Sequence, residues 1–139
     1  MSTRYPHASR LLWSLINSGL GTTLSGAGNS GAWSAGPGVQ SAVDLREITD
    51  VWLSVYTGGA VSGGAPSLVA SLDVFDDQGN LFAGLLSTAA ISATATGKAV
   101  SGGLHAGAGS SLVFPSFGRV SWTVGTGTFN QVTISLFGR

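Results

Sequence analysis

Hydrophobic and polar residues alternate along most of the chain from residue 39 onward. Residues 48–56 divide into two faces, one with Val51, Leu53 and Val55 and the other with Trp52, Ser54 and Tyr56. Because successive side chains of a strand point to opposite faces, this period of two predicts a half-buried β-strand. The same period recurs in residues 67–75 and 120–124, and Asp76-Asp77-Gln78-Gly79-Asn80 is a hairpin turn signal.

The last strand is expected to have an apolar face and an outward aromatic face. Its first set is Asn130, Val132, Ile134 and Leu136, and its second set includes Phe129 and Phe137. A short strand is also expected in residues 111–118, ended by Pro115, and His105 is expected in a Gly-rich loop. About seven or eight short strands with Gly-rich turns predict an all-β fold, an antiparallel β-sandwich that is jelly-roll-like.

The N-terminal segment breaks this alternation and predicts a short helical arm. Ser9 is a suitable N-cap, and within residues 10–17 the apolar positions recur four apart, as Leu11 with Leu15 and Leu12 with Ile16. A helix of about two turns is not stable alone, so it must lie against something. Its own domain and a neighbouring subunit are both open as the surface that it covers.

Residues 19–38 are rich in Gly and Ser and have the composition of a linker or a loosely attached strand. Trp33 is the exception, and a single Trp in such a stretch often anchors it by burying its ring. The chain is therefore divided into an N-terminal arm with a Gly/Ser-rich segment, residues 1–38, and a β-sandwich domain, residues 39–139.

Composition removes several classes of function. The 139 residues carry six Lys and Arg against six Asp and Glu, and charged residues make up 9%, where soluble domains carry roughly 25%. No basic cluster favours nucleic acid, and no apolar run approaches the ~20 residues of a membrane span. With no cysteine there is no disulfide or thiol chemistry. The low charge favours association with other subunits.

Candidate chemical sites are weak. His7 and His105 lack metal-ligand spacing, and residues 76–80 fit a turn better than a calcium loop. Asp44, Glu47 and Asp50 near Arg46 fit a solvated or interfacial ion cluster rather than a pair of catalytic carboxylates. We therefore expect no enzyme activity, no catalytic residue, no metal and no cofactor.

Trp52 and Tyr56 are the most informative exposed candidates. If Val51, Leu53 and Val55 fill the core, these two rings lie on the opposite face and form a candidate binding stripe. The alternative is that the N-terminal segment of the same chain covers them. Phe129 and Phe137 raise the same question on the last strand, because an exposed apolar stripe needs a partner.

A recognisable order of strands and turns runs through residues 51–56, 63–68, 76–80, 117–119 and 125–129. By this order residues 46–139, about two thirds of the chain, resemble small structural proteins of tailed bacteriophages. The resemblance does not extend to the N-terminal arm. Similar β-sandwich proteins decorate capsids, frequently as trimers, so the resemblance implies a virion protein more firmly than a position within the virion.

The expected function is that of a capsid decoration (cement) protein that binds and stabilises the phage head. Its expected partners are the major capsid protein and further copies of itself, as a homo-oligomer such as a trimer, with no nucleic acid and no membrane. It would be made in the host cytoplasm and reside on the capsid surface. The residues expected at the capsid or subunit interface are Tyr5, Leu11, Leu12, Trp13, Leu15, Ile16, Trp33, Trp52 and Tyr56.

Two other functions stay open at this point. A lectin-like carbohydrate-binding module would stack sugar rings on an exposed Trp52 or Trp33. A tail or connector component would share the same fold and composition.

Overall fold

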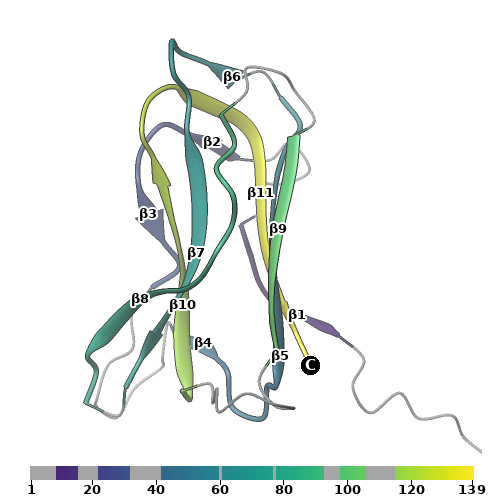
Figure 1. The fold of residues 1–139 in the computed structure, drawn as a ribbon, viewed down its shortest axis with the longest axis vertical. Coiled ribbons are helices and arrows are strands. Elements are labelled where there is room, and N and C mark those ends of the chain that lie inside the picture. Colours follow the sequence, from purple (N-terminus) through teal and green to yellow (C-terminus); the bar gives the residue numbers. More distant parts are fainter. Residues whose placement is uncertain are drawn as a thin grey trace, which may run out of the picture.

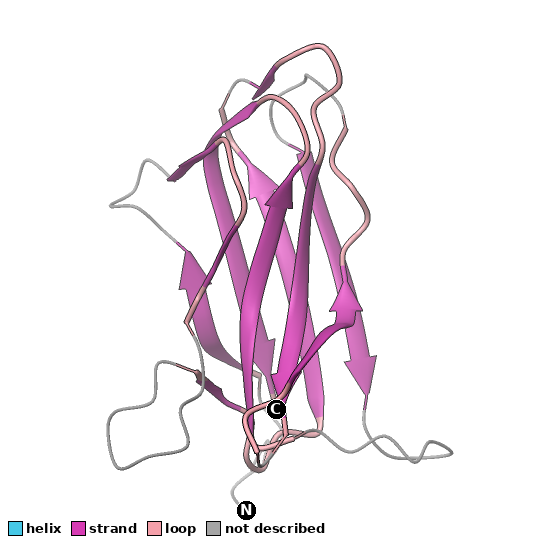
Figure 2. Ribbon diagram, turned by 90° about the vertical axis from the view of Figure 1, so that its left-hand side faces the viewer, coloured by secondary structure: helices cyan, strands magenta, loops and turns pink. Residues whose placement is uncertain are grey.

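A computed structural model gives the fold of the chain. It describes residues 9–15, 22–31, 42–59, 61–76, 78–92, 98–105 and 115–139. Within these ranges every regular element is a β-strand, and Figure 2 shows long strands running side by side along the molecule. None of the described segments forms a helix long and apolar enough to cross a membrane.

The strands form two antiparallel sheets that face each other as two layers (Figure 1). We call them the β11 sheet and the β10 sheet. The β11 sheet has the order β1 (Arg10–Leu15), β11 (Thr128–Gly138), β5 (Asp50–Thr57) and β9 (Lys98–His105), and β2 (Thr22–Leu24) and β6 (Val61–Ser62) also pair with β11. The β10 sheet has the order β3 (Gly28–Asn29), β10 (Phe117–Val124), β7 (Leu68–Phe75) and β8 (Leu81–Ser87), and β4 (Val43–Asp44) also pairs with β10.

The core lies between the layers and is built by the alternation of the long strands. The inward side chains of β5 are Val51, Leu53 and Val55, which are buried as the sequence predicts. They join one apolar cluster with Leu68, Ala70, Leu72 and Val74 of β7, Val120 of β10 and Val132, Ile134 and Leu136 of β11. Burial of such aliphatic side chains is the main force that holds two sheets together.

Two tryptophans close one side of this core. Trp13 of β1 and Trp122 of β10 come from different sheets, and their rings stack with centroids 6.2 Å apart and planes inclined by 21°. Both rings are partly buried against the apolar cluster. The first long strand is therefore attached to the second layer as well as to its own.

The expected helix at the N-terminus is wrong for residues 10–15, which form strand β1. Leu11 pairs with Phe137 and Trp13 with Leu136, so two residues of β1 span one residue of β11 and Leu12 is the extra residue of a bulge. An isolated two-turn helix is unstable, whereas pairing with β11 supplies hydrogen-bond partners for the backbone. Ile16 and Asn17, the rest of the expected helix, lie outside the described residues.

The placement of Phe129 on the outward face is also wrong, because Phe129 is fully buried. On β11, Phe129 and Val132 are three residues apart, yet they pair with Leu24 and Thr22 of β2, which are two apart. Gln131, at φ 52°, lies in this bulge. The extra residue reverses the alternation, so Phe129 and Val132 both face the core while Phe137 keeps its outward position.

The turn predicted at residues 76–80 is confirmed at its described positions. Asp76 Oδ1 accepts hydrogen bonds from the backbone N–H groups of Gln78 and Asn80, at 2.9 and 2.7 Å, and Asp76 Oδ2 accepts one from Asn80 Nδ2 at 2.8 Å. These bonds lower the pKa of the Asp76 carboxyl, with the Asn80 side chain as the largest cause. The carboxylate therefore organises a turn, as an Asx residue commonly does.

Two further expectations about strand limits are corrected. His105 is the last residue of β9 rather than part of a loop, and β10 begins at Phe117, beyond Pro115, and runs to Val124. Proline cannot donate to a strand ladder, so β10 starts after it. Residues 111–114 lie outside the described residues.

Candidate functional site

The outer face of the β11 sheet is the candidate site. The register places residues of neighbouring strands in transverse rows. One row is Leu11, Phe137, Trp52 and Gly103; the next is Ser14, Ser135, Ser54 and Ser101; the third is Thr133, Tyr56 and Ala99. We call these three rows the docking face. Because the bulge at Leu12 lies at one end of β1, Leu11 faces outward here while Trp13 faces the core.

Exposed apolar side chains lie at both ends of the docking face. Trp52 is 47% exposed and Tyr56 48% exposed, which confirms the sequence-based expectation that they turn away from the core. They are four residues apart on one strand, a separation of about 13 Å. The half-buried ring of Phe137 lies 5.9 Å from that of Trp52, centroid to centroid, and Leu11 is exposed on the other side of Phe137.

The middle of the docking face is a row of serines. Ser14 and Ser135 share a hydrogen bond between their Oγ atoms at 3.2 Å, and Ser54 is the register partner of Ser135 on β5. On β9 the register partners of Trp52 and Tyr56 are Gly103 and Ala99.

None of the register positions of the docking face holds an acidic or basic residue. Asp50 lies two residues before Trp52 on the same face of β5, and Arg139 Nε binds its Oδ2 at 2.7 Å. Core regions of protein interfaces are depleted of charge and enriched in Trp, Tyr and Phe. The docking face shares the aromatic residues and the lack of charge, and its serine row departs from that composition.

The residues of the expected arm differ in exposure. Leu12, Trp13 and Leu15 are partly buried against the core of their own chain. Four of the interface candidates in the arm are described, and of these four Leu11 is the exposed one. It belongs to the docking face. Tyr5, Ile16 and Trp33 lie outside the described residues.

Strands from the expected arm segment also complete both sheets. Within residues 1–38, β1 and β2 pair with β11, and β3 pairs with β10. The described parts of this segment are therefore integral to the fold.

Of the acidic residues predicted to cluster near Arg46, Asp44 forms an ion pair with it, whereas Asp50 pairs with Arg139. Asp44 accepts hydrogen bonds from the backbone N–H and Nε of Arg46 at Oδ1, both at 2.9 Å, and from Nη2 at Oδ2 at 2.8 Å. The Arg46 side chain is the main cause that lowers the pKa of Asp44 from 3.8 to about 2. The Arg46 guanidinium also lies over the ring of Phe117, 5.4 Å from its centroid. No group of potential metal ligands gathers within the described residues.

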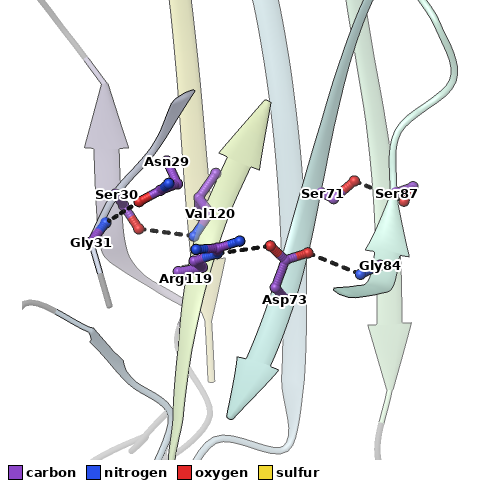
Figure 3. Close-up of polar contacts among 9 residues, drawn as sticks. All are labelled: Asn29, Ser30, Gly31, Ser71, Asp73, Gly84, Ser87, Arg119 and Val120. Carbon is purple, nitrogen blue, oxygen red and sulfur yellow. Dashed lines mark hydrogen bonds and ion pairs between the residues drawn. The ribbon is translucent and has the colours of Figure 1, made fainter. Parts of the chain in front are cut away.

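Sequence reasoning missed a second polar cluster, on the outer face of the β10 sheet. Asp73 of β7 and Arg119 of β10 are register partners, and Arg119 Nε lies 3.0 Å from Asp73 Oδ2 (Figure 3). Asp73 is only 2% exposed. The alternation of residues 67–75 could have marked Asp73 as an outward residue, but no local signal pairs it with a residue 46 positions away.

Comparison with known proteins adds no family assignment. No model of a known protein family matches the chain, and no curated protein matches it either. The functional argument therefore rests on the residues and their geometry.

Proposed function

We propose that the chain is a non-enzymatic structural protein of a tailed phage, a jelly-roll-like β-sandwich that binds the assembled head through its docking face and stabilises it. The observation that carries this proposal is the docking face itself, with exposed Trp52, Tyr56 and Leu11 in rows that hold no charged residue. The resemblance of residues 46–139 to phage structural proteins supports the choice of partner.

The composition of the docking face favours a protein partner. Trp and Tyr contribute most to binding energy when they enter pockets from which water is excluded. The serine row between the rings carries short side chains with hydroxyls that can both donate and accept hydrogen bonds. A broad protein surface can approach such rows closely and cover both rings at once.

Stabilisation of the head would follow from selective binding. A protein that binds the assembled shell, and not its free subunits, shifts the equilibrium towards the shell. A shell repeats its subunits, so one docking face per copy suffices for many copies to bind. The jelly-roll-like connectivity is supported by the alternation of strands between layers, since β5, β9 and β11 lie in one sheet and β7, β8 and β10 in the other.

The test is sedimentation of the purified protein with undecorated heads of the phage that encodes it. The wild-type chain is expected to pellet with the heads at a saturating stoichiometry set by capsid symmetry. The double variant Trp52→Ala with Tyr56→Ala is expected to remain in the supernatant while keeping its fold by circular dichroism. Sedimentation of the protein alone gives its oligomeric state.

Phe82→Ala is the matched control. Phe82 is 57% exposed but lies on β8 of the other sheet, so its removal deletes an exposed aromatic ring without touching the docking face. It should pellet like the wild type. Equal pelleting of the Trp52/Tyr56 double variant, or no pelleting of the wild-type protein, would contradict the proposal.

A further inference from the structure

The outer face of the β10 sheet, the layer that does not carry the docking face, holds an open pocket of about 490 Å³. This volume is within the range of about 300–1,000 Å³ that is usual for small-ligand sites. Among the described residues its polar lining comprises Asn29, Ser71, Asp73, Arg119, Ser121 and Thr123. Its remaining lining comprises Ala27, Gly28, Ala83, Gly84 and Trp122.

A break in strand pairing builds one wall of the pocket. Leu72 pairs with Leu86 and Val74 with Phe82, so two steps along β7 match four along β8. Gly84 lies in this bulge at φ 73°, a conformation that favours glycine, and its N–H donates to Asp73 Oδ1 at 2.9 Å (Figure 3). The Asp73 carboxylate thus accepts a backbone N–H that would otherwise serve the strand ladder.

Each carboxylate oxygen of Asp73, the acidic member of the ion pair at the pocket, has its own hydrogen-bond partner. Asp73 binds Gly84 through one oxygen and Arg119 Nε through the other, at 2.9 and 3.0 Å. The Arg119 side chain is 22% exposed, and its Nη groups lie outside this ion pair. A guanidinium carries five N–H donors in a fixed plane, so an anchored Nε orients the remaining donors.

Other polar groups of the lining are also fixed. Asn29 Oδ1 accepts the backbone N–H of Gly31 at 3.0 Å, which directs its Nδ2 donors away from that bond. Ser71 Oγ and Ser87 Oγ lie 2.9 Å apart. Figure 3 shows these groups on neighbouring strands around the Asp73–Arg119 pair. Such preorganised donors and acceptors lower the cost of ordering a site when a ligand binds.

From this geometry we propose that the pocket binds a neutral saccharide. The charges of Asp73 and Arg119 cancel, and the other lining side chains are uncharged, so the site favours neutral ligands over anions. Sugar hydroxyls both donate and accept, which matches a lining that mixes amide, guanidinium, hydroxyl and carboxylate groups. The small residues Ala83 and Gly84 leave room for a ring to approach the sheet, whereas the Trp122 ring fills the space beside Gly28.

This inference is independent of the docking face. It uses the opposite layer, and Trp52 and Tyr56 do not contribute to the pocket. On a particle decorated through the β11 sheet, the pocket would face outward, where cell-surface glycans are met.

The test is a titration of the ¹⁵N-labelled full chain, followed by amide NMR signals. The probes are methyl glycosides of glucose, galactose, mannose, rhamnose and N-acetylglucosamine, with methyl glucuronide as the anionic probe. At least one neutral glycoside is expected to shift the signals of Gly84, Arg119 and Ser121 in a saturable way. Signals of Trp52 and Tyr56 are expected to stay in place.

Three variants test whether the glycoside binds in this pocket. Arg119→Lys keeps the charge opposite Asp73 but loses the planar donors, and should weaken the neutral glycoside about tenfold or more. Ala83→Trp fills the pocket without changing the ion pair and should abolish binding, and Tyr56→Ala should bind like the wild type.

Three outcomes would overturn the inference. They are the absence of any saturable shift at the pocket, binding of methyl glucuronide alone, and shifts centred on Trp52 and Tyr56. Each leaves the head-binding experiment unaffected, because that experiment reports on the other face.

Discussion

The outer faces of the two sheets have the same strand geometry but carry different kinds of side chain. On the β11 sheet the three rows of the docking face hold aromatic rings, serines and no charged residue, and the Asp50–Arg139 ion pair lies next to them on the same face. On the β10 sheet a nearly buried carboxylate and an arginine pair across two strands beside hydroxyl and amide groups. The first face suits a broad dry contact, and the second suits a small polar ligand.

The bulges explain much of this difference. On the β11 sheet, bulges at the ends of β1 and β11 decide which rings reach the surface, and they leave the middle rows regular. On the β10 sheet, the bulge in β8 lies next to Asp73 and turns a backbone N–H towards its carboxylate. Irregular strand pairing thus decides which rings face outward on the β11 sheet, and it forms a wall of the pocket on the β10 sheet.

The largest expected effect on stability is a difference between two phenylalanines of β11, one in the core and one on the docking face. Phe129→Ala should lower the free energy of unfolding by about 4 kcal/mol, because it empties a fully buried position. Phe137→Ala, on the docking face, should cost about 1 kcal/mol. Urea unfolding followed by tryptophan fluorescence measures both. Similar losses for the two variants would contradict the bulge at Gln131.

The next effect concerns the ion pair of the β10 sheet. Asp73→Ala should cost about 3 kcal/mol, because Arg119 is left largely buried without its partner. Ser54→Ala, at the comparable central position of the docking face, should cost about 0.5 kcal/mol. The double variant Asp73→Leu with Arg119→Met should cost about 1–2 kcal/mol, because no charge is left unpaired but the Gly84 N–H loses its acceptor. A double variant as unstable as Asp73→Ala would show that the pair itself stabilises the fold.

A charge placed on the docking face should separate binding from stability. Ser54→Lys should weaken pelleting with heads about tenfold, because a desolvated ammonium without a partner opposes a dry contact. Its unfolding free energy should change by about 0.5 kcal/mol, since the long side chain reaches solvent. Thr123→Lys, on the outer face of the β10 sheet, is the control and should pellet normally. A normal stoichiometry and affinity for Ser54→Lys would exclude the serine row from the contact.

The smallest effect is acid sensitivity at the periphery. Arg46 lowers the pKa of Asp44 to about 2 from 3.8, so the pair stabilises the fold above about pH 4 and that contribution is lost as the pH falls towards 2. Both side chains are more than half exposed, which limits the effect to less than about 1 kcal/mol. Asp44→Asn should remove this part of the pH dependence in chemical unfolding between pH 5 and pH 2. An unchanged profile would assign the acid sensitivity to other carboxylates.

Local pattern determined the strands whose alternation is unbroken. The period of two in β5 separated Val51, Leu53 and Val55 from Trp52 and Tyr56, and the structure buries and exposes these sets accordingly. The turn at residues 76–80 followed from Asp, Gly and Asn in sequence. Such features could be predicted because they depend on side chains and hydrogen bonds within a few residues.

Tertiary structure decided the features that depend on distant strands. The four-residue spacing of Leu11 and Leu15 fitted a helix, but β11 offered backbone partners and a bulge that fitted the same residues as a strand. Phe129 entered the core because β2 and β11 differ by one residue in their register. Asp73, Arg119 and Gly84 met only because β7 pairs with both β10 and β8. Local alternation therefore predicts which strands are half-buried, whereas pairing between distant segments sets where each bulge falls and which polar groups meet.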